Sequence, residues 1–423
     1  MHGKERKIKN GNANNIRRKE RFMTEKRPLV FALANRKGGV SKTTNTANIG
    51  YAFAQQGYKV LLIDDDPQGS LTQMLGIDRN VGGEQELSVM NFVRVSRSLR
   101  GELPEHYPVD DLFGNPSKWE TESHEIPGLH NLVNKVFFGD PVTREDVDAC
   151  ILSPTYRVPK QRRGPKPAGM TEEQEYDEYF FGFDLIPSGE ALTDDELLIA
   201  LDQSEERRAG KGTILLQICS LVAKYRDYDI ILIDTGPSLG VLTVNAIAAA
   251  TDGVIISASV DEQSLWSLSK FKLNLRQIKQ MIPGHEGVLG VILAPVDPRA
   301  QIYPIIRSKI TEVLQLYLFP AVIARSATAA KATSSGVLYS QLDENAYQSY
   351  QELAKEILER HAQNTKWEHE RNSKVSARIE ELAAMPENAG KEYPVLEQIV
   401  RDEYSEGKLW EMPDSQIYKE EEK

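Results

Sequence analysis

The sequence is poor in cysteine, which removes several classes of protein from consideration. Only Cys150 and Cys219 occur in 423 residues, far apart and without a Cys-x-x-Cys pair. Neither an iron–sulfur scaffold nor a disulfide framework is supported, and both cysteines are expected to be reduced core residues. The seven histidines show no metal-binding spacing. Cysteine and histidine therefore give no sign of a metal or redox centre.

The chain also lacks long apolar runs and an excess of positive charge. No stretch approaches the ~20 apolar residues of a membrane span, and the charged N-terminus has no apolar signal core. The net charge of −11 argues against wholesale polyanion binding, so any contact with DNA must be local. We expect a cytoplasmic protein with one large α/β domain and appendages.

The most informative segment is residues 37–44, Lys-Gly-Gly-Val-Ser-Lys-Thr-Thr. It follows an apolar run at 29–34 and precedes a helix-like stretch at 46–54, which is the strand–loop–helix context of a phosphate-binding loop. Its glycines allow backbone N–H groups to point at an anion at the start of a helix. Lys42 is expected to reach the β- and γ-phosphates, and the Thr43 hydroxyl to bind Mg²⁺. The predicted nucleotide contacts are Gly38, Gly39, Val40, Ser41, Lys42, Thr43 and Thr44.

Acidic residues follow two further apolar strands. In residues 60–68 the strand runs into Asp64, Asp65 and Asp66, and in 228–239 another ends at Asp234 in a Walker B pattern. Strand alternation places Asp64 and Asp66 on one face, where they can orient water and hold a metal's hydration shell, and turns Asp65 away. Asp234 is expected to bind Mg²⁺ through water.

A second lysine, Lys37, stands five residues before Lys42. An ordinary phosphate-binding loop needs no charge there, and two lysines would crowd like charges unless one points elsewhere. Lys37 is either a surface lysine at a strand end or a group that reaches the nucleotide of a partner subunit, as an arginine finger does.

Three stretches together resemble the ParA/MinD family of deviant Walker ATPases, and within it the ParA/Soj partition branch. They are residues 34–40, 61–69 and 233–240. The resemblance spans about 28–363 and implies an α/β P-loop NTPase fold, with a mostly parallel central sheet flanked by helices on both faces. It implies ATP and Mg²⁺ as cofactors and an ATP-dependent homodimer in which Lys37 acts across the interface. It also assigns hydrolysis to Asp66 with Asp64 in support, and metal binding to Thr43, Asp66 and Asp234.

Two positions depart from the family pattern. Ser41 stands where glycine is usual, so the geometry of the phosphate-binding loop is expected to differ slightly. Ala324 replaces the proline of an Ile-Pro-Arg motif. The resemblance nevertheless places Arg325 on the adenine side of the nucleotide.

The remaining segments flank or interrupt the predicted ATPase domain, residues 28–363. Residues 1–27 form a basic arm that either touches DNA or solubilises the chain. An insertion at about 85–180 contains helix-like stretches at 87–97 and 129–150. It also contains a loop with a basic half, 160–166, and an acidic half, 172–178. That loop is either a minor-groove arm or a self-neutralising solvated hairpin. Residues 364–423 form an acidic, partly helical C-terminal extension, with helical stretches at 373–385 and around 393–404.

Strands are predicted at 253–259 and 287–293, with another near 321–323. Between the first two, a helix at 264–281 carries basic residues and no acid. Its lysines and arginine recur at helical spacing and share a face, which is either a DNA patch or a solvated surface. The candidate DNA contacts, including two on a following helix, are Lys272, Arg276, Lys279, Arg307 and Lys309.

The predicted function is a DNA partition ATPase whose ATP-bound dimer associates with the nucleoid through nonspecific DNA. A ParB-like centromere-binding partner is implied by the resemblance alone, and the long insertion and tail favour a plasmid origin. The alternatives are a regulator of plasmid replication or transfer with negligible turnover, and a MinD-like positioning ATPase. The acidic end of the chain, 416–423, disfavours a membrane-docking helix.

Overall fold

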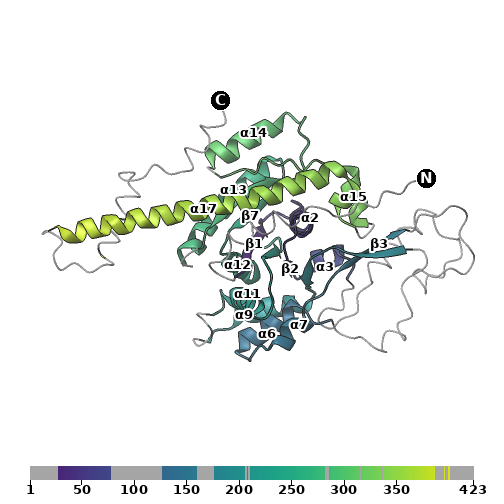
Figure 1. Cartoon of the computed structure of the whole chain (residues 1–423), viewed down its shortest axis with the longest axis horizontal. Coiled ribbons are helices and arrows are strands. Elements are labelled where there is room, and N and C mark those ends of the chain that lie inside the picture. The colour runs from purple at the N-terminus through teal and green to yellow at the C-terminus, as the bar shows by residue number, and fades with distance from the viewer. Residues whose placement is uncertain are drawn as a thin grey trace, which may run out of the picture.

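Six parallel strands form the central sheet of the computed structural model (Figure 1). The structure describes residues 27–77, 126–159, 176–204, 207, 210–281, 285–314, 316–334, 337–385, 395, 399 and 400. The strand order is β5-β2-β6-β1-β7-β8. The strands are β1 (Leu29–Ala34), β2 (Val60–Asp65), β5 (Asp184–Ile186), β6 (Ile230–Thr235), β7 (Val254–Ala258) and β8 (Val288–Leu293). The central β1 therefore lies between β6 and β7, and it leads directly into the phosphate-binding loop.

Helices cover both faces of this sheet because its strands are apolar on both sides. Alternate residues of β1 divide between two cores: Phe31 and Leu33 face one layer, and Val30 and Ala32 face the other. The first layer contains α2 (Lys42–Gln55), α3 (Ser70–Met74), α15 (Ala327–Ser334), α16 (Tyr339–Leu342) and α17 (Glu344–Ala384). The second contains α6 (Leu129–Phe138), α7 (Arg144–Ala149), α9 (Ala191–Leu201), α11 (Ile214–Tyr225), α12 (Val241–Ala249), α13 (Glu262–Met281), α14 (Ile302–Ser308) and the π-helical turn η2 (Lys309–Val313). The predicted fold class is confirmed.

The described part of the insertion contains α6, α7 and a hairpin. Strands β3 (Thr155–Pro159) and β4 (Tyr176–Phe180) pair antiparallel and extend to one side of the sheet (Figure 1). The hairpin agrees with the solvated-hairpin interpretation, but residues 160–175, which hold its basic half and part of its acidic half, lie outside the described residues. So do the helix predicted at 87–97 and residues 1–26 of the N-terminal arm.

One expectation about the C-terminal part is wrong. The strand predicted near 321–323 is absent: the described chain makes only isolated bridges, from Leu318 to Val291 and from Ala324 to Val296. Pro320 removes a backbone donor at the start of that segment, which disfavours a continuous ladder.

The helix predicted at 373–385 is the end of α17, a single helix of 41 residues. No glycine or proline occurs between 344 and 384, so nothing in the chain interrupts it across residue 363. Asp343 caps its start by accepting a hydrogen bond from the Ala346 N–H. In Figure 1 the C-terminal half of α17 projects beyond the sheet. No helix in the described part of the chain combines the length and apolar character needed to span a bilayer.

Candidate nucleotide-binding site

The phosphate-binding loop connects the carboxyl end of β1 to the first turn of α2. Gly39 has φ +71°, and Ser41, directly before α2, has φ 60° and ψ 24°. Ser41 is the non-glycine residue with positive φ among the described residues. Serine thus adopts the left-handed conformation that glycine would take without steric cost, and the loop keeps its shape at the price of local strain.

Lys42 lies almost buried at the start of α2, with 7% of its surface exposed. Its ammonium is 3.5 Å from the backbone carbonyl oxygen of Lys37. Burial lowers the pKa of Lys42, while the nearby Asp234 and Asp66 carboxylates act in the opposite direction. An anion held by the loop would give this buried cation the partner it needs. Phosphate binding by Lys42 stays a prediction, and the structure places its ammonium beside the loop.

Asp234, the last acid of β6, has the features of a magnesium-associated residue. One carboxylate oxygen accepts a hydrogen bond from the Thr46 hydroxyl at 2.9 Å, and the other is buried without a hydrogen-bond partner in the described structure. Burial raises the pKa of Asp234 to about 6, against hydrogen bonds from Thr43 and Thr46 that lower it. A free carboxylate oxygen beside the Thr43 hydroxyl provides the hard oxygen donors that Mg²⁺ prefers, so these residues fit the predicted ion.

Asp64 and Asp66 occupy different environments, because β2 ends at Asp65 and Asp66 lies in the loop that follows. Asp64 is fully buried: one oxygen accepts from the N–H and hydroxyl of Thr72 at 2.8 and 2.7 Å, and the other from the Asp66 N–H at 3.2 Å. Burial, and secondarily the charge of Asp234, raises the pKa of Asp64 to about 8. Asp64 therefore holds the backbone of Asp66 and the start of α3 in place through these hydrogen bonds.

Asp66 lies in the loop after β2 and faces the loop after β6. Its carboxylate accepts a hydrogen bond from the Gln68 N–H at 3.0 Å. A Cβ added at Gly236 would stand 3.3 Å from the same carboxylate oxygen. Because Gly236 has no side chain, the loops after β2 and β6 can approach each other beside Lys42. A residue that positions water near a phosphate must lie this close to the phosphate-binding loop.

Asp65 points to the other face of the sheet, as strand alternation predicts. Both of its carboxylate oxygens are buried without a hydrogen-bond partner in the described structure. Burial raises the pKa of Asp65 well above its ordinary value, and the charges of Asp64 and Glu196 act in the same direction. This side chain is a local cost to stability.

A pocket of about 210 Å³ lies beside the phosphate-binding loop. Its lining combines the start of α2 with the segment before α15 and residues of α16 and α17. The lining residues are Ser41, Thr44, Asn45, Pro295, Ile323, Ala324, Arg325, Ser326, Ala329, Tyr339 and Tyr350. Arg325 thus lies next to the loop, where the resemblance places the adenine side.

Sequence reasoning missed the aromatic part of this pocket. The Tyr350 hydroxyl donates a hydrogen bond to the Asn45 side chain at 2.8 Å, and the Asn45 amide donates to the Ser257 hydroxyl at 2.9 Å. No local motif marks Tyr350, because it lies 305 residues from Asn45 in the chain. The hydrogen bonds nevertheless couple α17 to the start of the nucleotide site.

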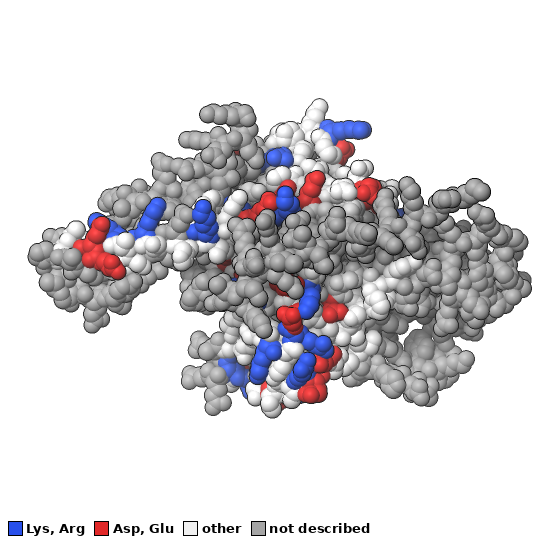
Figure 2. Space-filling view, in the orientation of Figure 1, with Lys and Arg blue, Asp and Glu red and all other residues white. Residues whose placement is uncertain are grey.

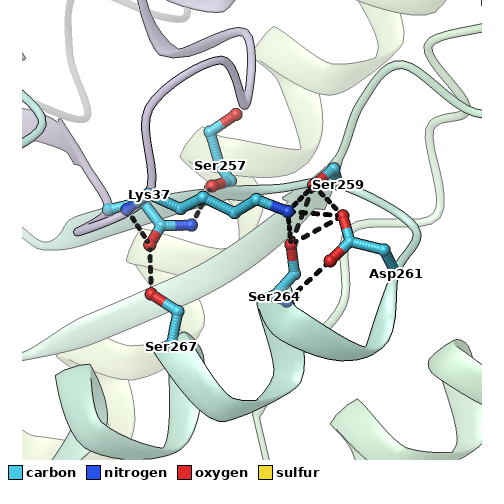
Figure 3. Close-up of polar contacts among 7 residues, drawn as sticks. Lys37, Ser257, Ser259, Asp261, Ser264 and Ser267 are labelled. Atoms are coloured by element: carbon cyan, nitrogen blue, oxygen red, sulfur yellow. Dashed lines mark hydrogen bonds and ion pairs between the residues drawn. The ribbon is translucent and has the colours of Figure 1, made fainter.

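Lys37 turns toward the carboxyl end of β7 and the first turn of α13 (Figure 3). Its ammonium is 2.7 Å from Asp261, 3.3 Å from the Ser259 hydroxyl and 3.5 Å from the Ser264 hydroxyl. Burial opposes ionisation of Asp261, but hydrogen bonds from Lys37 and Ser259 lower its pKa to about 2. Sequence reasoning did not identify Asp261, although an acid just beyond a parallel strand lies at the edge where ligands bind.

The candidate DNA contacts do not form a uniform group in the structure. Lys309 is exposed at the start of η2, whereas Arg307 is half-buried and its guanidinium lies 3.3 Å from the Tyr303 hydroxyl. The Lys272 ammonium donates to the Leu314 carbonyl, which holds it against the protein. The side chains of Arg276 and Lys279 lie outside the described residues. On the face shown in Figure 2, described Lys and Arg side chains are interspersed with Asp and Glu.

The parallel sheet, the phosphate-binding loop between β1 and α2, and the acidic ends of β2 and β6 define a P-loop NTPase fold. The chain belongs to the ParA/MinD family of such proteins: a family model described as an AAA domain matches residues 29–126 and 168–285. The predicted family membership is thereby confirmed.

Named relatives agree with this placement. The chain is 27% identical over 333 residues to the chromosome partitioning protein ParA of Caulobacter vibrioides, covering 78% of this chain and 94% of that protein. It is 25% identical over 331 residues to the sporulation initiation inhibitor protein Soj of Bacillus subtilis, covering 78% and 97%. Cobyrinic acid a,c-diamide synthase from Mycobacterium smegmatis, solved with an ATP analogue and magnesium, aligns with a TM-score of 0.50 at 23% identity, covering 78% of this chain and 93% of that chain. That structural likeness concerns the fold alone.

Proposed function

We propose that this protein is an ATP-dependent DNA partition ATPase that uses Mg²⁺. The observation that carries the proposal is that Lys42, Asp66 and Asp234 meet beside one phosphate-binding loop. These three residues come from α2 and from the ends of β2 and β6. Asp234 accepts a hydrogen bond from Thr46 of α2, and the Asp66 carboxylate lies against Gly236 in the loop after β6. The relatives named as partitioning proteins support the cellular role, and the site geometry supports the chemistry.

The loop N–H groups and Lys42 bind the phosphates, and Thr43 and Asp234 hold the metal ion. Bound Mg²⁺ supplies positive charge that neutralises the transferring phosphoryl group. Asp66 orients the attacking water, and Asp64 fixes the backbone of Asp66 through the 3.2 Å hydrogen bond. Positioning and electrostatic stabilisation account for most of the catalysis of this reaction, so fixed placement of these groups is what the protein must provide.

Adenine occupies the pocket of about 210 Å³ in this proposal. The pocket has apolar and aromatic walls with a few polar groups, as is typical of sites for planar ligands. Tyr339 and Tyr350 supply aromatic surface, and Ser326 and Arg325 supply polar contacts. This arrangement supports the adenine-side assignment of Arg325.

ATP closes two subunits face to face, with each Lys37 contributing to the phosphates of the partner. Dimerisation doubles the weak DNA contacts of one subunit, among them exposed Lys309, and two linked weak sites bind a polymer more tightly than one. Nucleotide thereby switches nonspecific DNA binding and places the ATP-bound dimer on the nucleoid. A ParB-like partner stimulates hydrolysis, which releases the dimer, and the cargo is a plasmid or another mobile element.

Retention of the purified protein on nonspecific duplex DNA tests this function. It should be measured with ATP, with ADP and without nucleotide at one salt concentration, because phosphate contacts depend strongly on salt. We expect retention with ATP only, and loss of ATP binding and retention in Lys42→Ala. Equal retention in all three conditions would show that the protein binds DNA independently of nucleotide. No retention in any of them would overturn the partition assignment.

A further inference from the structure

The Lys37 ammonium is fully engaged within its own chain. An ammonium group has three hydrogens to donate, and three oxygen atoms surround this one, at 2.7 Å from Asp261, 3.3 Å from Ser259 and 3.5 Å from Ser264. Figure 3 shows the lysine side chain extended along the end of β7 toward α13. The described contacts thus direct the ammonium of Lys37 toward acceptors of its own chain.

The acceptor group is itself held in place. Asp261 accepts a hydrogen bond from the Ser264 N–H at 2.9 Å through one oxygen, and so caps the first turn of α13. Its other oxygen binds Lys37 and also accepts from the Ser259 hydroxyl at 2.5 Å. Asp261 therefore joins the phosphate-binding loop to α13 with the two oxygens of one carboxylate.

The other end of the lysine is anchored as well. The Lys37 N–H lies 3.2 Å from the Asn35 side-chain oxygen, and Ser267 of α13 donates to that oxygen at 3.1 Å. The Asn35 amide in turn donates to the Ser257 carbonyl at 2.6 Å. Because backbone and side chain are both fixed, the direction of Lys37 is determined by this network rather than by solvent.

We propose that Asp261 is a positioning residue that retains Lys37 within the monomer and thereby opposes ATP-dependent dimerisation. This inference rests on the proposed function, in which Lys37 reaches the phosphates bound by the partner. The ammonium cannot occupy both places, so each protomer breaks its Lys37–Asp261 contact when the dimer forms. Bound ATP on the partner replaces Asp261 as the anionic ligand, and ADP, with one phosphate fewer, is the weaker competitor.

Asp261→Asn is the decisive substitution because asparagine caps helices about as well as aspartate but carries no charge. Glu262→Gln is the matched control: it removes the same charge one residue further along, at an exposed position in the first turn of the same helix. Thermal unfolding of both variants establishes that the fold is retained. Any specific effect on Lys37 should appear in the first variant only.

The first measurement uses the nucleotide-free wild-type and variant proteins. Acetylation of Lys37 by an amine-reactive ester is followed by mass spectrometry, with exposed Lys309 as the internal reference. We expect roughly two- to fivefold faster labelling of Lys37 in Asp261→Asn, the range for loss of one partly exposed ion pair. Unchanged labelling would show that Asp261 does not retain Lys37 and would overturn the inference.

The second measurement is sedimentation velocity with a non-hydrolysable ATP analogue and Mg²⁺. Because two contacts break per dimer, the dimer dissociation constant of Asp261→Asn should fall roughly 4- to 25-fold relative to wild type. An unchanged or higher dimer dissociation constant would refute the proposal that Asp261 competes with the partner's ATP for Lys37. It would show instead that Asp261 does not oppose dimerisation. Failure of the wild-type protein to dimerise would overturn the proposed function and the competition together, while the labelling result would still decide whether Asp261 holds Lys37.

Discussion

Replacing Ser41 with glycine should stabilise the protein, although it removes a side chain. Ser41 has φ 60° and ψ 24°, in the left-handed region. This conformation costs a residue with a Cβ about 1–2 kcal/mol of folding free energy. Glycine relieves that cost but adds about 0.4–1 kcal/mol of backbone freedom in the unfolded chain. The net gain in the free energy of unfolding should therefore be about 1 kcal/mol or slightly less.

Three variants isolate this backbone effect from the chemistry of the hydroxyl. Ser41→Ala keeps the Cβ and loses only the oxygen, so its stability should match that of the wild type. Ser41→Val adds β-branching, which makes a positive φ a severe outlier, and should destabilise the protein by more than 1 kcal/mol, on the order of the cost of local backbone strain. The expected order of stability is Gly above Ser and Ala, with Val lowest.

Urea unfolding of the nucleotide-free protein, followed by circular dichroism, measures these differences as shifts in midpoint at constant slope. ATP affinity should be retained in the glycine variant because the loop keeps its backbone conformation. A glycine variant less stable than wild type would refute the reasoning, as would a valine variant of equal stability, since either result would mean that Ser41 carries no strain.

Three further outcomes are expected. Asp65→Leu, which is close in shape to aspartate, should raise the free energy of unfolding by about 1–3 kcal/mol because it removes an unpaired buried carboxylate, and a loss of stability in thermal unfolding would contradict this. Burial lowers the pKa of His361, but Glu286 at 2.9 Å and Asp252 at 3.9 Å outweigh this effect, so the pKa is raised overall. Protonated His361 therefore stabilises the fold below pH ~6.5, and this stabilisation is lost as the pH rises through the raised pKa. His361→Gln should accordingly lower the free energy of unfolding by about 1.5–3 kcal/mol at pH 6 and by less at pH 9. A difference that does not depend on pH would show that the ion pairs of His361 do not stabilise the fold. Asp66→Ala should retain ATP binding and remain on DNA with ATP, and wild-type phosphate release by this variant would exclude Asp66 from hydrolysis.

The sequence alone determined the phosphate-binding loop, the positions of the main strands along the chain and the family of the protein. These features are local: residues 29–44 form a strand, a loop and the start of a helix that depend on neighbours a few positions away. The acids at the ends of β2 and β6 were also predictable, because parallel strands bring their carboxyl ends to one edge of the sheet. Hydrophobic runs with strong periodicity are sufficient for such conclusions.

Local pattern was insufficient where distant segments meet or where no signal breaks an element. The strand expected at 321–323 does not form, and α17 continues through the expected end of the core because it contains no glycine or proline. Contacts between residues far apart in the sequence could not be predicted: Lys37 contacts Asp261, 224 positions away, and Asn45 contacts Tyr350, 305 positions away. Only the packing of β7 and α17 against the loop and α2 places these side chains together. The tertiary structure therefore decided which acid holds the loop lysine and which aromatic residues complete the pocket, because side-chain partners are selected by the packing of whole elements rather than by neighbours in the chain.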